Sequence, residues 1–226
     1  MHQKPDPAMV LLAVLSWNKV SLLLTIAAPA FAVVSCIRLR PPRAPLFSAL
    51  LPLVALGFVV EAIGLCTAWF GIHNSSVFNA YVVAEFLLVL RLVAIARPGP
   101  KWPLYLTALS GITAMAWSWS RWRSLDFLLT EGVSVSALLL CAWLLVLLWR
   151  LSEHSLIALG KVPSFWVFTG LLLYFGALFP VIGPLRYLYS DHPALAFYLY
   201  SIVQALSLVR YGLIGYGCLL EARSRP

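Results

Sequence analysis

The sequence predicts an all-α fold: a polytopic transmembrane bundle of seven helices in one domain (1–226), with the N-terminus out and the C-terminus in. Of its residues, 62% are hydrophobic and 11% are charged, whereas soluble domains carry about 25% charged residues. The mean hydropathy is +0.92, and a helix needs about 20 apolar residues to cross a bilayer. Segments of about that length recur at 18–38, 46–72, 75–97, 102–120, 126–150, 163–187 and 193–217.

Prolines mark where these segments begin and end. The stretch "RLRPPRAP" (38–45) separates the first segment from the second, and "RPGPKWP" (97–103) separates the third from the fourth. Pro163 opens the sixth segment and Pro193 opens the seventh. The missing N–H of proline costs nothing there, because the first turn of a helix leaves its N–H groups without partners inside the helix.

Lys and Arg flank the segments unevenly, and this asymmetry predicts the orientation. They gather after the first, third and fifth segments and at the C-terminal end, whereas "GIHNSS" (71–76) has none. Loops rich in Lys and Arg stay on the cytoplasmic side, which favours an outer N-terminus, although Arg121 and Arg123 favour the reverse. Basic residues at helix ends are typical of contact with anionic membrane lipid, so the net charge of +8 does not indicate nucleic acid.

Three glutamates lie inside the apolar segments, in the second, third and fifth. A charged side chain at mid-membrane costs at least about 2.5–3.5 kcal/mol, so such residues normally face the bundle interior and pair or take up a proton. One interpretation is that these acids only hydrogen-bond neighbouring helices. The other is an outward-facing ligand cavity, for which the candidate residues are Glu61, Glu85, Glu131, Tyr81, Tyr174, Gln204, Asn79 and His73.

Two arginines also lie inside apolar segments. Arg91 stands six residues before Arg97, and Arg210 lies in the inner part of segment 193–217. Both are expected to extend their side chains toward the cytoplasmic headgroups, as long basic residues near helix ends do. Arg91 also lies about 120° around the helix from Glu85, which argues against an ion pair within the segment.

Cofactor sites known from membrane bundles need residues that these segments lack. Retinal requires a lysine in the last segment, which has only Arg210, and haem between helices requires paired histidines at mid-membrane. His73, His154 and His192 all lie at segment ends, and a zinc site built from His73 or His192 with a glutamate is a weaker alternative. The four cysteines form no CxxC pair, and no nucleophile motif occurs. We predict no catalytic residue, no metal site and no cofactor.

The chain resembles a group of uncharacterised bacterial membrane proteins of about this length with seven predicted helices. The features that carry the resemblance are Glu61-x-x-Gly64, Asn79 followed by Glu85, Glu131, and the stretch "PSFWVFTGLLLYFGALF" (163–179). The resemblance covers nearly the whole chain. It implies a bacterial inner-membrane (plasma-membrane) location and a stand-alone bundle, and it implies no activity.

Together these features favour a sensory or signalling membrane module that binds a small or lipidic ligand from outside. Because the C-terminal tail is too short to act as an effector, it would act through a partner membrane or signalling protein. The cavity suits an amine-bearing or hydroxyl-bearing ligand whose apolar body packs on Phe78, Phe86, Phe175 and Phe197. The alternatives are a proton-coupled transporter, an accessory subunit of a larger membrane complex, and a lipid-directed enzyme with acid/base carboxylates. The pattern fixes no oligomeric state.

Overall fold

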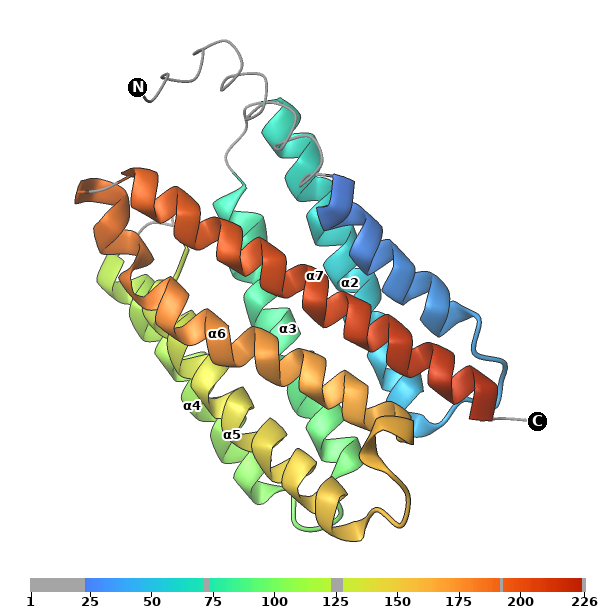
Figure 1. The fold of residues 1–226 in the computed structure, drawn as a ribbon. Coiled ribbons are helices and arrows are strands. Elements are labelled where there is room, and N and C mark those ends of the chain that lie inside the picture. Colours follow the sequence, from blue (N-terminus) through green and yellow to red (C-terminus); the bar gives the residue numbers. More distant parts are fainter. Residues whose placement is uncertain (1–22, 71–73, 123–127, 192, 225–226) are drawn as a thin grey trace, which may run out of the picture.

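The computed structural model describes residues 23–70, 74–122, 128–191 and 193–224, and over these residues the chain is all-helical (Figure 1). Five of the helices, α2, α3, α5, α6 and α7, are long and apolar enough to cross a membrane. Each predicted segment contains a helix. The α-helices are an N-terminal helix Leu23–Ile37, α2 Pro45–Trp69, α3 Ser75–Ala96, α4 Trp102–Trp122, α5 Thr130–His154, α6 Pro163–Asp191 and α7 Pro193–Ser224, with a 3-10 turn, η1 Leu159–Lys161, before α6.

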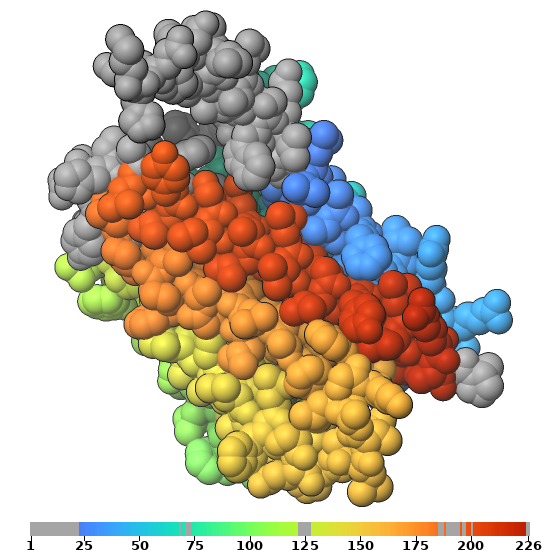
Figure 2. All heavy atoms as spheres, in the orientation of Figure 1, coloured from blue at the N-terminus to red at the C-terminus, as the bar shows by residue number. Residues whose placement is uncertain are grey.

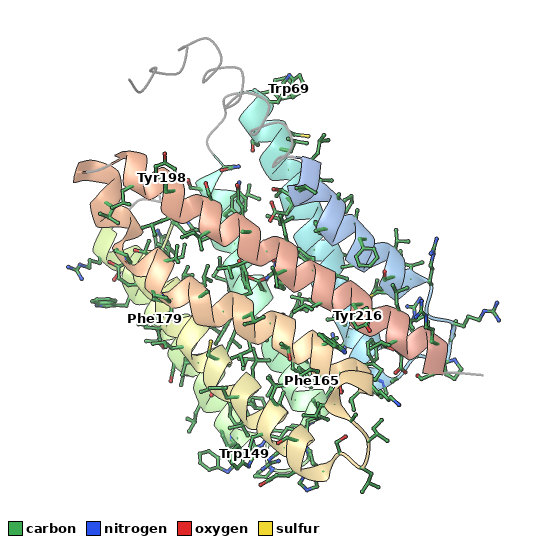
Figure 3. The ribbon with its side chains drawn as sticks, viewed as in Figure 1. Trp69, Trp149, Phe165, Phe179, Tyr198 and Tyr216 are labelled. Carbon is green, nitrogen blue, oxygen red and sulfur yellow. The ribbon has the colours of Figure 1, made fainter. Side chains whose placement is uncertain are left out.

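The outer surface of the bundle has the character of a lipid-facing surface. Leu106, Leu109 and Leu145 are each more than half exposed, and many other large apolar side chains are exposed with them, which is not usual for a soluble monomer. Figure 3 shows Trp69 and Trp149 projecting at opposite ends of the bundle. Tryptophan prefers the two interfaces between lipid and water, so side chains at these two ends are typical of a bundle that spans a membrane.

Helix α3 packs against three other helices. It contacts α2, α4 and α5, while α6 packs between α5 and α7. Val89, Leu92 and Val93 of α3 have no exposed surface, and they form part of the hydrophobic core. In Figure 2 the side chains of α6 and α7 form one continuous face beside the N-terminal helix.

Two helix boundaries differ from the predicted ones in ways that matter for the site. Helix α7 continues to Ser224, seven residues beyond the predicted end at 217. Helix α5 begins at Thr130 rather than at 126, which places Glu131 in its first turn. Apolar residues continue across both predicted boundaries, so hydrophobicity alone did not locate them.

The packing of the N-terminal helix on α7 has a direct chemical test. The buried side chains of Cys36 and Cys218 place their sulfur atoms 2.7 Å apart. Oxidation of the detergent-solubilised protein with copper phenanthroline should therefore join them, and denaturation followed by maleimide labelling should show two thiols lost. Cys36→Ser should prevent the cross-link, whereas Cys66→Ser, at an exposed cysteine, should not. Full labelling of all cysteines in the oxidised wild type would contradict this packing.

Candidate functional site

A cavity of about 440 Å³ lies among the helices and is lined by residues of all the spanning-length helices α2, α3, α5, α6 and α7. Its wall is mostly apolar and includes Phe78, Phe86 and Phe175. A concave, mainly apolar pocket of this size with a few placed polar groups is the usual form of a small-molecule site. The principal polar side chains that line it are Glu61, Tyr81, Glu85, Tyr174, Gln204 and Arg210.

The cavity extends through only one half of the bundle. Its lining begins at Asn74 and Ser75, where α3 starts, and its innermost residues include Phe86, Leu140 and Arg210. Beyond them the helices are closed by fully buried core side chains, such as Leu144 in α5 and Val167 in α6. The cavity therefore lies in the half of the bundle where α3 begins, and the core closes it toward the other half.

The inner end of the cavity holds a buried ion pair between α3 and α7. Glu85 and Arg210 are each 3% exposed, and Nη1 of Arg210 donates to Oε1 of Glu85. The Tyr81 hydroxyl donates to the same oxygen at 2.6 Å. Residues four apart lie on one face of a helix, so the spacing of Tyr81 and Glu85 in the sequence is sufficient to bring them together. The Glu85 carboxylate is thus held by two donors.

Aromatic residues complete the surroundings of Arg210. Its Nη2 donates to the Tyr211 hydroxyl at 2.7 Å and to the Tyr81 hydroxyl at 3.2 Å. The guanidinium carbon lies 3.9 Å from the ring centre of Tyr174 in α6, a cation–π distance. Its Nε has no hydrogen-bond partner within the described part of the chain. One buried cation therefore connects α3, α6 and α7.

The prediction that Arg210 extends to the headgroups was wrong. Because α7 runs to Ser224, Arg210 lies 14 residues from its end, roughly 21 Å at about 1.5 Å per residue. That distance exceeds the reach of an arginine side chain, so the charge is offset locally by Glu85. The signal in the sequence is the run of ten uncharged residues between Arg210 and Glu221. Arg91, in contrast, is exposed.

Glu61 of α2 lines the same cavity, but unlike Glu85 it forms no hydrogen bond with the described residues. Its half-buried carboxyl interacts electrostatically with Arg210 and Glu85. The Gln204 side chain of α7 likewise makes no hydrogen bond to any residue in the described ranges. At about 1.5 Å per residue, Glu61 lies roughly 12 Å before the end of α2 and Glu85 roughly 15 Å after the start of α3, so their depths match. Two polar side chains thus offer unused hydrogen-bonding groups to the cavity.

Glu131 lies outside this cavity. In the first turn of α5 its carboxylate accepts hydrogen bonds from Ser118 Oγ of α4 at 2.8 Å and from Thr130 Oγ1 at 3.3 Å. A carboxylate is favourable at a helix N-terminus, where the N–H groups lack partners inside the helix. The structure therefore brings Glu61 and Glu85 to one cavity and places Glu131 between α4 and α5.

Asn79 also joins helices and does not line the cavity. It is buried, and its Oδ1 accepts the backbone N–H of Leu129 at 3.1 Å, which fixes the start of α5 against α3. His73 lies outside the described residues, as does the side chain of Phe197. The lining also includes Asn74, Ser136 and Ser207, which the sequence patterns did not single out.

Comparison with protein-family models, with curated proteins and with solved structures finds no match to this chain. The resemblance drawn from short motifs therefore stays a prediction, and the function must be argued from the site itself.

Proposed function

We propose that this protein is a seven-span sensory or signalling protein of the bacterial inner membrane that binds a small or lipidic ligand in its cavity. The observation that carries the proposal is the position of the Glu85–Arg210 pair at the inner end of that cavity. A ligand that strengthens or weakens this ion pair would change the position of α7 relative to α3, since a ligand shifts the population toward the conformation that it binds better. Helix α7 would transmit the change to a partner membrane or signalling protein.

The arrangement of the helix ends supports an outer N-terminus and a cavity that faces outward. In Figure 1 the N-terminal helix, α3, α5 and α7 all end at the same end of the bundle. Basic residues gather at this end, which makes it the cytoplasmic end under the positive-inside rule. The cavity begins at Asn74 and Ser75, next to the α2–α3 connection at the other end. The basic residues at or after these four helix ends are Arg38, Arg40, Arg43, Arg97, Lys101, Arg150, Lys161 and Arg223.

A proton-coupled carrier is the second candidate, and Glu61 is the residue that favours it. A carboxyl without a hydrogen-bond partner in the described residues would serve as a protonation site. The core beyond Arg210 argues for the first candidate, because a carrier must open a path toward the other end of the bundle and fully buried Leu144 and Val167 close it here.

Occupancy of the cavity should be visible in native mass spectrometry of the protein released from nanodiscs. Val203 lines the cavity, so Val203→Trp should fill it and remove a bound species that the wild type retains. The matched control is Ile202→Trp, because Ile202, the neighbour of Val203, is 46% exposed on the lipid-facing surface. This variant should keep the bound species. Retention of that species by Val203→Trp, or a wild type that carries none, would contradict ligand binding in this cavity.

A further inference from the structure

We infer that the ligand of this cavity is a singly charged cation with an apolar body, such as an alkyl or aryl amine, and that Glu61 recognises its charge. This inference rests on the proposed function and names the class of ligand. It follows from the charges that line the cavity, the hydrogen-bonding groups left unused there, and the character of its wall.

The charged side chains of the lining are two carboxyls and one guanidinium. Arg210 is committed to Glu85, which Tyr81 also binds, so this acid and this base offset each other. Glu61 remains as one acid in excess, half-buried among apolar helices. A carboxyl inside a membrane normally pairs or takes up a proton, and a bound cation would supply such a partner. An anion would meet repulsion from Glu61 and an arginine that is already paired.

The unused polar groups suit an ammonium better than a hydroxyl. An ammonium has three N–H donors and no acceptor. Gln204 and Ser207 stand three residues apart on α7 and both line the cavity with Glu61, so a carboxylate, an amide oxygen and a hydroxyl oxygen are available to accept. A hydroxyl donates one proton only. The amine class therefore uses more of the groups that the cavity offers.

The rest of the cavity suits an apolar body. Two helices, α3 and α6, contribute apolar side chains to its lining: Phe78, Val82, Phe86, Phe175 and Leu178. Burial of apolar surface against such side chains contributes about 25 cal/mol per Å², and aromatic faces also attract a nearby cation. A cavity of about 440 Å³ accommodates a molecule of ordinary small-ligand size.

Three probes that share one tail and differ in headgroup measure the contribution of the headgroup to binding. Binding of octylamine, octanol and octanoate to the protein in nanodiscs of zwitterionic lipid should rank in that order. Glu61→Gln should weaken octylamine binding about tenfold or more, because it removes a charge-assisted hydrogen bond, and should change octanol binding about twofold or less. Glu153→Gln removes the same charge from an exposed position near the basic end and should leave all three affinities unchanged.

The outcomes distinguish an error in the proposed ligand class from an error in the proposed binding site. Equal binding of octanol and octylamine, or an unchanged octylamine affinity in Glu61→Gln, would overturn the cation inference even if Val203→Trp abolishes binding of both. If none of the probes binds the wild type more tightly than it binds Val203→Trp, the cavity itself is not the site and the proposed function fails as well. Thermal unfolding of each variant in detergent verifies that the loss is not one of folding.

Discussion

Arg210→Ala should lower the free energy of unfolding by about 3–5 kcal/mol, the cost of breaking a buried ion pair by removing one partner. The substitution leaves Glu85 as a carboxylate that is 3% exposed with only Tyr81 as its donor, and it removes the donor to Tyr211. Unfolding in detergent, followed by circular dichroism, measures the loss. Arg91→Ala, at an exposed arginine of α3, should change stability by about 0.5 kcal/mol or less.

The double variant Glu85→Leu with Arg210→Met tests whether the loss of stability comes from leaving one buried charge unpaired. Replacing both members of a buried ion pair with apolar residues of similar size is often neutral or stabilising. The double variant should therefore regain most of the stability that Arg210→Ala loses. An Arg210→Ala protein with wild-type stability would show that the pair does not connect α3 to α7. A double variant as unstable as the single one would show that the loss does not come from leaving Glu85 unpaired.

Gly57→Ala should destabilise the contact between α2 and α7. The Tyr211 hydroxyl occupies the place where the new Cβ would stand, and Cζ of the same ring would lie 3.0 Å away. The ring must move, and its hydroxyl then loses the hydrogen bond from Arg210. Overpacking costs about 1–3 kcal/mol and alanine recovers about 1 kcal/mol of helix propensity, so we expect a net loss of up to about 2 kcal/mol in detergent unfolding.

Two further variants test the cause of this loss. Gly212→Ala in α7 has nothing within 4 Å of its new Cβ and should stabilise the protein by up to about 1 kcal/mol. Tyr211→Phe removes the clashing hydroxyl, so adding it to Gly57→Ala should restore part of the lost stability. If Gly57→Ala is as stable as Gly212→Ala, α2 and α7 do not pack as described.

The sequence was sufficient for the helices and for the contact between Tyr81 and Glu85, because both depend on local spacing. It was not sufficient for the pairing of Glu85 with Arg210, which are 125 residues apart. Helices that are apolar on all sides carry no periodic pattern to show which face meets which partner. The same lack of contrast hid the true ends of α5 and α7, and these errors misplaced Glu131 and Arg210 along their helices.

Photolabelling with an octylamine analogue that carries a diazirine in its tail tests most directly whether a ligand occupies this cavity. The labelled protein, digested and sequenced by tandem mass spectrometry, should carry adducts on lining residues such as Phe78, Val82 and Val203, and excess octylamine should suppress them. Adducts confined to lipid-facing positions such as Leu106 and Leu109, and unaffected by excess octylamine, would contradict the site.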